Sequence, residues 1–476
     1  MISYSRRLTD LATAAPDRPA ITCGTESVTR AEFESLSNRM ARSLQAKGVE
    51  TGDMVTIALA NSVGWFVATA ACWKLGAIPQ PVSSRLPARE FEAIIELARP
   101  KAVLGPEPLD VPPYLDDWPL PDAVSPAWKA PTSGGSTGRP KLIVSGDPSV
   151  IDPEQPSPLL FSDDGSFVMP GPMYHNGPIV WSCGALLKGN HVAVLPRFDA
   201  EATLAAVDEH RADVIYLVPT MMKRILRLSD DVRTKYDLSS LRWVWHLAEP
   251  CPAWLKQAWI DWLGPDRIIE LYGGTEGQAA TVITGGEWLE HRGSVGRPSH
   301  GQIVILDADG HELPPGSEGE IWMRSGREKP TYRYIGAEAR SREGGWESLG
   351  DVGWVDEDGY LYLGDRMQDM VLCGGANIYP AEVESALQEH PAVRSVAVIG
   401  LPDDDLGNRL HAIVETEGEA LDEQELRSFL QDRLVNYKIP RSFEFVDEAL
   451  RDDAGKVRRA QLRAERVSGG GELSGC

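Results

Sequence analysis

The sequence predicts an α/β protein with a large N-terminal domain of α/β sheet layers and a small antiparallel subdomain, followed by a small mobile α+β C-terminal domain. Three observations predict it. Helix-like and strand-like patterns alternate in the first half of the chain, short strands with turn signals follow at about 290–365, and a compact unit starts after residue 366. The 476 residues also exceed one ordinary core, so two or more domains are expected.

The N-terminal domain is expected over residues 1–365. Its helices are predicted at 65–75, 89–98, 200–210 and 221–228, and its buried strands at 55–59, 77–82, 101–104, 191–195 and 214–217. Residues 105–128 are rich in Pro and Asp and are predicted to form a loop. The turn sequences 307–310 and 356–359, each flanked by alternating apolar residues, predict the antiparallel subdomain.

The C-terminal domain is expected over residues 366–466. Helices are predicted at 380–389 and 422–434 and strands at 394–400 and 410–416, with Asp422 as the N-cap of the second helix. The Gly- and Ser-rich residues 467–476 are expected to be a disordered tail.

The composition is that of a soluble globular protein. A net charge of −23 argues against binding to nucleic acids or anionic membranes. The six scattered cysteines indicate reduced thiols and neither a zinc site nor disulfides, and no stretch has the apolar length of a membrane span or the pattern of a signal peptide. We therefore expect a cytoplasmic protein, a monomer or homodimer, whose partners are small molecules.

The most informative segment is Ser133-Gly134-Gly135-Ser136-Thr137-Gly138-Arg139-Pro140-Lys141. Glycines allow backbone N–H groups to turn toward an anion, hydroxyl groups add donors, and Lys141 adds positive charge, so the segment suits a polyphosphate. It is not a Walker A loop, which needs Gly-Lys-Ser/Thr at the start of a helix. Here Pro140 precedes the lysine and Leu142-Ile143-Val144 follow it, which predicts a hairpin between two strands.

Further motifs occur in a fixed order after this loop. They are Tyr272-Gly273-Gly274-Thr275-Glu276, Gly350-Asp351-Val352-Gly353, Gly364-Asp365-Arg366, the segment 374–384, and Gly455-Lys456. Together with the loop they resemble the adenylate-forming superfamily of acyl-CoA synthetases, adenylation domains and luciferases, and the pattern is most similar to that of bacterial acid–CoA ligases. The resemblance covers roughly residues 5–465.

The resemblance implies that an acid reacts with ATP to give an acyl-adenylate and pyrophosphate, and that the acyl group then passes to a second nucleophile. It places the ATP phosphates on Ser133, Gly134, Gly135, Ser136, Thr137, Gly138 and Lys141. Tyr272 would offer a ring face to the adenine, and Gly273 would belong to the same nucleotide site. Thr275 would contact a phosphate, Asp351 the ribose hydroxyls, and Arg366 ribose or phosphate. Glu276 would be the Mg²⁺ ligand, and Lys456 would stabilise charge in the transition state.

Two further segments gain roles from the same resemblance. His175, in Gly171-Pro172-Met173-Tyr174-His175, would act in catalysis by contacting the carboxylate or by closing the tunnel to the second substrate. The segment 374–384 would enter the site when the C-terminal domain rotates for the second half-reaction.

The sequence also departs from the family pattern. The phosphate loop begins Ser-Gly-Gly where the family usually has Thr-Ser-Gly, Gln368 stands at a hinge position that is usually Asp or Lys, and acidic residues precede Gly455-Lys456. The loss of one hydroxyl at Gly134 and the neutral hinge are the two differences that bear on the site.

The wall of the expected acid pocket is unusual because it carries Trp243-Val244-Trp245-His246. As strand residues, Trp243 and Trp245 would share one face, opposite Val244 and His246. Packing of the tryptophans in the core is favoured, whereas Trp245 or His246 turned inward would leave a small or a flat aromatic pocket.

These observations favour an ATP- and Mg²⁺-dependent acid–CoA ligase with ATP and CoA as co-substrates. One alternative is an adenylating enzyme of the same fold with another substrate or acceptor, such as a diazotase that activates nitrite for transfer to an aryl amine. The other is a non-catalytic nucleotide-binding protein, against which Glu276, Asp351 and Lys456 argue because a pure binder needs no catalytic lysine. The sequence does not identify the acid.

Overall fold

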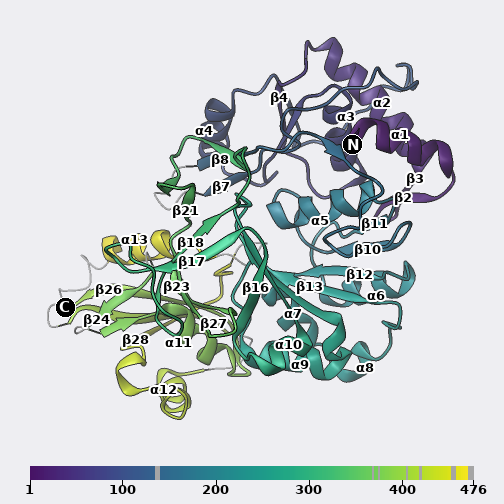
Figure 1. Ribbon diagram of the computed structural model, residues 1–476. Coiled ribbons are helices and arrows are strands. Elements are labelled where there is room, and N and C mark those ends of the chain that lie inside the picture. The colour runs from purple at the N-terminus through teal and green to yellow at the C-terminus, as the bar shows by residue number, and fades with distance from the viewer. Residues whose placement is uncertain are drawn as a thin grey trace.

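A computed structural model describes residues 1–134, 140–366, 369–373, 376–403, 406–416, 421–451 and 457–469. Figure 1 shows the N-terminal segments at the upper right and the C-terminal elements gathered at the left. Within the described ranges, no helix combines the length and the apolar character needed to cross a membrane.

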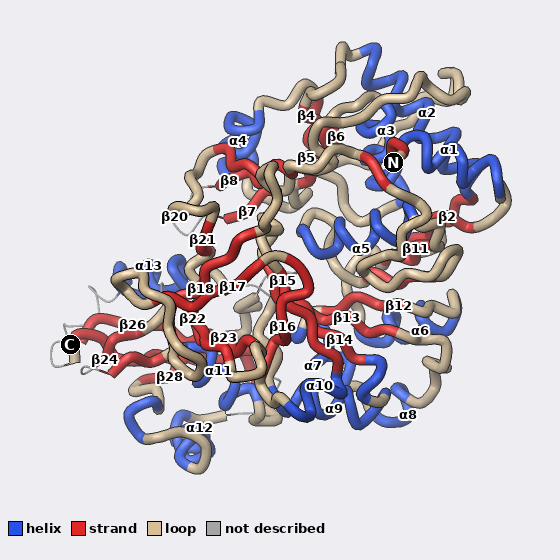
Figure 2. The backbone as a smooth tube through the Cα atoms, viewed as in Figure 1, coloured by secondary structure: helices blue, strands red, loops and turns tan. Residues whose placement is uncertain are grey.

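A mixed sheet of 15 strands forms the spine of the N-terminal part (Figure 2). Its order is β20 (Arg340–Arg342), β21 (Trp346–Ser348), β18 (Gly319–Arg324), β22 (Asp351–Val355), β23 (Leu361–Arg366), β16 (Ser294–His300), β15 (Ala280–Thr284), β14 (Ile268–Gly273), β13 (Trp243–Leu247), β12 (Val214–Leu217), β10 (Ser166–Met169), β11 (His191–Val194), β2 (Pro19–Cys23) and β3 (Glu26–Thr29), with β17 (Gln302–Leu306) paired to β18. The neighbours β14, β13, β12, β10, β11 and β2 pair parallel. The neighbours β14, β15, β16, β23 and β22 pair antiparallel. The predicted α/β domain and its antiparallel extension are thus confirmed.

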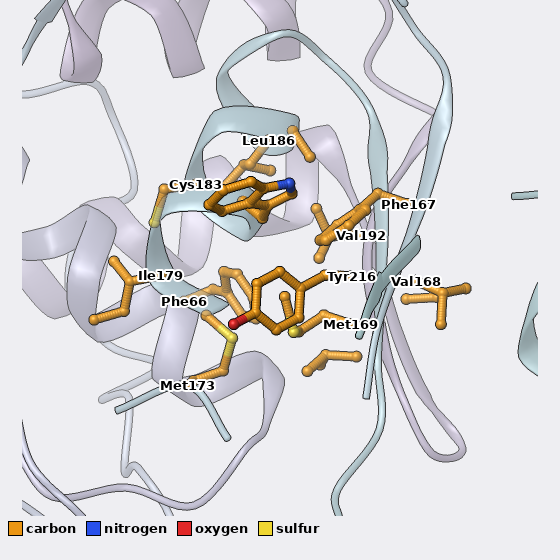
Figure 3. Close-up of a cluster of buried hydrophobic side chains, with 14 of the residues drawn as sticks. Phe66, Phe167, Val168, Met169, Met173, Ile179, Cys183, Leu186, Val192 and Tyr216 are labelled. Carbon is orange, nitrogen blue, oxygen red and sulfur yellow. The ribbon is translucent and has the colours of Figure 1, made fainter. Parts of the chain in front are cut away.

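Helices alternate with the strands of the N-terminal part, as the pattern predicts, and α5 to α9 lie between strands of the parallel run. They are α1 (Tyr4–Ala14), α2 (Arg30–Ala46), α3 (Val63–Lys74), α5 (Asn176–Leu187), α6 (Ala200–Glu209), α7 (Pro219–Leu226), α8 (Asp230–Arg233), α9 (Ala253–Leu263) and α10 (Gly285–Glu290), with a 3₁₀ turn at Pro265–Arg267. Figure 3 shows Tyr216 of β12 packed among Phe66 of α3, Ile179 and Cys183 of α5, and Met173. Burial of these apolar surfaces joins helices distant in the sequence to one sheet.

Smaller sheets complete the N-terminal part. Parallel β4 (Met54–Ile57), β5 (Ile78–Pro81) and β6 (Ala102–Leu104) form one, which α4 (Ala88–Ala98) accompanies, and β1 (Ile2–Ser3) pairs with β9 (Val150–Ile151). The predicted phosphate-loop hairpin is present because β7 (Thr132–Gly134) pairs antiparallel with β8 (Pro140–Ser145), and β19 (Tyr332–Ile335) adds to β8.

The C-terminal part has its own core of apolar side chains. Its elements are β24 (Val371–Cys373), β25 (Ala376–Ile378), α11 (Pro380–Gln388), β26 (Val393–Asp403), β27 (Gly407–Thr416), α12 (Glu423–Gln431), a 3₁₀ turn at Asn436–Lys438, β28 (Ser442–Val446) and α13 (Arg459–Gly469). Asp422 caps α12 as predicted, accepting a hydrogen bond from the Glu425 N–H at 2.8 Å.

Two sequence expectations about the C-terminal part need correction. Helix α12 ends at Gln431 and not at residue 434. Helix α13 extends to Gly469, so residues 467–469, expected in a disordered tail, are helical. The i, i+4 pair of Gln461 and Glu465 on α13 is the kind of contact that favours a helix even in a polar segment.

Candidate active site

A cavity of about 2420 Å³ lies between the N-terminal and C-terminal parts. Its wall includes the sequence-predicted residues Ser133, Lys141, His175, Tyr272, Gly273, Thr275, Glu276 and Asp351. These residues come from segments far apart in the sequence, and the fold brings them to one surface. Gly135, Ser136, Thr137, Gly138, Gln368 and Lys456 lie outside the described residues.

Glu276 lines this cavity and is held by a network of side chains. Its side chain is 6% exposed, and its Oε1 accepts a hydrogen bond from the Tyr334 hydroxyl at 2.5 Å. The Lys141 ammonium lies 3.5 Å from the same oxygen and 4.0 Å above the Tyr334 ring. The carboxylate is therefore oriented by two side chains, and an oxygen ligand of this kind suits Mg²⁺.

Sequence reasoning did not identify Tyr334. Burial, and then the hydrogen bond to Glu276 and its charge, raise the pKa of the Tyr334 phenol. The hydroxyl therefore stays protonated and donates a hydrogen bond to the carboxylate. Tyr334 reaches Glu276 because β19 pairs with β8, which places Tyr334 opposite Ile143. Only this long-range pairing reveals the contact.

Tyr272 and Asp351 form the second polar group of the cavity. Tyr272 lies near the end of β14, Asp351 begins β22, and the Tyr272 hydroxyl donates to Asp351 Oδ2 at 2.8 Å. The backbone of Arg366 pairs with that of Asp351 across β22 and β23, while the Arg366 side chain lies outside the described part of the chain. An aromatic ring beside a carboxylate offers a stacking face and acceptors for hydroxyl groups.

A glycine between these groups allows a close approach. A Cβ atom at Gly274 would lie 2.4 Å from the Leu349 side chain and 2.9 Å from Glu276 Oε2. A side chain at this position would displace the end of Leu349 and crowd the Glu276 carboxylate, so the turn after β14 favours glycine.

His175 is the N-cap residue of α5, and its ring lies 4.3 Å from that of Tyr174. The next residue, Asn176, accepts a hydrogen bond from the Lys129 ammonium. Lys129 is only 7% exposed, and burial lowers its pKa to about 8. Lys129 and Asn176 both line the cavity, and sequence reasoning identified neither.

Beyond His175 the cavity wall is aromatic. The ring of Trp181 on α5 packs edge-on against those of Tyr216 and Trp245, with ring centroids 5.4 Å and 5.6 Å apart. All three residues line the cavity. The Trp245 indole N–H donates to the Leu159 carbonyl at 3.1 Å. Trp245 is therefore both a core residue, as favoured from the sequence, and part of the pocket wall.

His246 lies on the opposite face of β13 and is fully buried. Burial, and the nearby positive charge of Lys256, hold the pKa of His246 far below its ordinary value, so the ring is neutral. Lys256 pairs with Glu270 at 2.6 Å, and Glu270 Oε1 lies 4.0 Å from His246 Nδ1. His246 is thus a core residue behind the wall.

Comparison with known proteins matches these features to one family. The chain belongs to the AMP-binding enzyme family, whose model matches residues 8–131 and 121–328, and residues 382–456 match the C-terminal domain of AMP-binding enzymes. The chain is an AMP-forming ligase of the adenylate-forming superfamily, as the sequence predicts.

Similar proteins cover nearly the whole chain. A feruloyl-CoA synthase of an Amycolatopsis species is 31% identical over 94% of this chain and 96% of its own. The o-succinylbenzoate CoA synthetase of Bacillus subtilis, solved with its acyl-adenylate intermediate, has a TM-score of 0.81 and 26% identity, covering 96% of this chain and 97% of its own. An amide bond synthetase of Marinactinospora thermotolerans has a TM-score of 0.77 and 27% identity, covering 97% and 99%.

Proposed function

We propose that this ligase activates a carboxylic acid as an acyl-adenylate, releases pyrophosphate and transfers the acyl group to CoA. The observation that carries the proposal is that two polar pairs, Lys141–Glu276 and Tyr272–Asp351, line the same cavity as the aromatic wall around Trp181. Tyr334 holds Glu276 in this arrangement through its hydrogen bond.

The polar groups suit the two ends of a nucleotide. Lys141 and the loop 133–138 would bind the phosphates, and Glu276 would hold Mg²⁺, which when bound neutralises the polyphosphate. Tyr272 and Asp351 would bind the adenine and ribose. Lys456 would arrive from the C-terminal domain, 366–466, which we propose moves between the two half-reactions.

The aromatic wall suits a flat acid. Trp181, Tyr216 and Trp245 line the cavity, and aromatic pairs prefer edge or offset contacts of the kind that these rings already make with one another. The feruloyl-CoA synthase among the relatives is named for an aromatic acid. We therefore propose an aromatic carboxylic acid as the substrate class.

A pyrophosphate-release screen tests this proposal. Aromatic, fatty and steroid acids and nitrite are each supplied with MgATP, with and without CoA. We expect release with aromatic acids and a thioester product when CoA is present. A Glu276→Gln variant should lose release while remaining folded.

A second candidate is transfer to an amine, which the likeness to an amide bond synthetase favours. In this case aryl amines would replace CoA as the productive acceptor in the same screen. AMP formation with nitrite and an aryl amine, independent of CoA, would establish the diazotase alternative.

A separate variant tests the assigned catalytic lysine. Unchanged ATP turnover in Lys456→Ala would refute this role of Lys456.

A further inference from the structure

Lys129 projects from the cavity face of the β7–β8 ladder. The ladder continues beyond β7, because Ser145 N–H donates to the Lys129 carbonyl and Ile143 N–H to that of Pro131, both at 3.0 Å. Side chains alternate between the two faces of such a ladder. Lys129, Ser133 and Lys141 therefore share the face that lines the cavity.

The opposite face of the same ladder is a packed core. Ala130 and Leu142 are fully buried there, and Val144 is 1% exposed. The register of the β7–β8 ladder thus places Lys129 on the face that lines the cavity. Its ammonium is directed toward the cavity at the beginning of α5.

The charge on Lys129 lacks a local counter-charge. Among the described residues, its ammonium has one hydrogen-bond partner, the neutral amide oxygen of Asn176, and no carboxylate within 4.0 Å. Two other buried lysines differ, because Lys74 lies 2.8 Å from Glu34 and Lys256 lies 2.6 Å from Glu270. A buried ammonium without an anion is costly, so such a group is retained where a ligand supplies the anion.

The charged groups around Lys129 have other partners. Glu276 is held by Lys141 and Tyr334, and Asp147 pairs with Arg327. Cys183, on the same helix as Asn176, remains an uncharged thiol because burial raises its pKa to about 12. These groups leave the position in front of Lys129 open to an incoming anion.

The beginning of α5 supports an anion at this position. The N-terminus of a helix favours negative charge, and within the described ranges no side chain caps α5 through a hydrogen bond. Asn176 and His175, its first residue and its N-cap, both line the cavity beside the aromatic wall. Lys129 thus contacts the first residue of the helix that carries Trp181.

We propose that Lys129, with the beginning of α5, binds the carboxylate of the acid substrate at the head of the aromatic pocket. The inference rests on the proposed function. The bound carboxylate oxygen forms a bond to the α-phosphorus of ATP while the bond from that phosphorus to pyrophosphate breaks. Lys129 keeps its proton throughout and positions the nucleophile.

Acid-dependent exchange of pyrophosphate into ATP tests the role of Lys129. Lys129→Met should raise KM for the acid at least tenfold and leave KM for ATP within about twofold, and Lys129→Arg should recover most of the loss. Lys188→Met is the matched control, because Lys188 is also buried but follows the other end of α5 and binds the Pro153 carbonyl. An unchanged KM for the acid, or an equal rise in both KM values, would overturn the proposal.

A direct binding measurement separates this inference from the proposed function. Lysines of the full chain are reductively methylated with ¹³C, and the Lys129 resonance is assigned as the one missing in Lys129→Arg. We expect this resonance to shift on addition of benzoate, a ring-substituted benzoate or a cinnamate, without ATP, and the Lys188 resonance to stay in place.

The exchange assay and the binding measurement together distinguish failure of the proposed function from failure of the inference on Lys129. If no acid supports exchange but carboxylates shift the Lys129 resonance, the proposed function fails and the anion site stands. If an acid supports exchange and the resonance does not move, the inference on Lys129 is wrong. A shift with nitrite and with no carboxylate would also overturn it, in favour of the diazotase alternative.

Discussion

The ionisation of Lys129 predicts how acid activation depends on pH. Burial lowers its pKa to about 8, and the more distant negative charges of Glu276 and Asp147 act in the opposite direction. The charged fraction would fall from about nine tenths at pH 7 to about one tenth at pH 9 for a group of this pKa. If the charged form binds the carboxylate, kcat/KM for the acid should fall about tenfold over this range.

Pyrophosphate exchange without CoA is the suitable assay, because the CoA thiol also ionises in this range. We measure kcat/KM for the acid from pH 7 to 9.5 in the wild type and in Lys129→Arg. The guanidinium stays charged throughout, so the variant should show a flat profile over the same interval. Cys183 does not interfere, since burial raises its pKa to about 12.

Three results would refute the reasoning. A flat wild-type profile would mean that the charge on Lys129 does not bind the acid. An equal fall in Lys129→Arg would assign the titration to another group. An equal fall in kcat/KM for ATP would place the titrating group in the nucleotide site.

Three other predictions concern the polar network, the pocket wall and the core behind it. Tyr334→Phe should raise KM for MgATP about tenfold or more, because the charged oxygen of Glu276 loses a hydrogen-bond donor. Such a bond contributes roughly 1.5–3 kcal/mol. KM for the acid should change less. Trp181→Ala should shift preference toward bulkier acids in the same screen, because it removes the ring against which Tyr216 and Trp245 pack; unchanged preference would place the acid elsewhere. His246 is neutral when buried but takes up a proton at its ordinary pKa when unfolded, so the free energy of unfolding should fall as pH drops below 6.5, by up to about 1.4 kcal/mol per pH unit. Urea titrations at pH 7.5 and 5 should show a smaller fall for His246→Phe, and an equal fall would assign the acid sensitivity to other groups.

Most of the fold could be predicted from the sequence because its signals are local. The hydrophobic alternation that predicts a strand at 214–217 and a helix at 200–210 depends only on neighbouring residues, and the structure has β12 and α6 there. The hairpin around the phosphate loop was likewise predictable from Pro140 and the β-branched residues after it. Helix ends were less predictable, as the early end of α12 at Gln431 shows, because tertiary packing decides them.

The candidate site was predictable where a motif carries it. Tyr272, Glu276 and Asp351 were found from sequence because each stands in a short pattern, and all three line the cavity. Tyr334 was not found, because its role depends on the pairing of β19 with β8, which joins segments about 190 residues apart in the chain. The dual position of Trp245 in core and wall similarly depends on the packing of α5 against β13.

The signal for Lys129 was nevertheless present in the sequence. Once the hairpin is predicted, Ser133 stands opposite Lys141, and counting back by two twice reaches Lys129 on the same face. Lys141 is already neutralised by Glu276, whereas the hydrogen-bond partner of Lys129 among the described residues is a neutral amide. We therefore expect a carboxylate to bind at Lys129 before ATP is bound. Because of this difference between the two lysines, the acid should bind to the free protein, and Lys129→Met should weaken that binding.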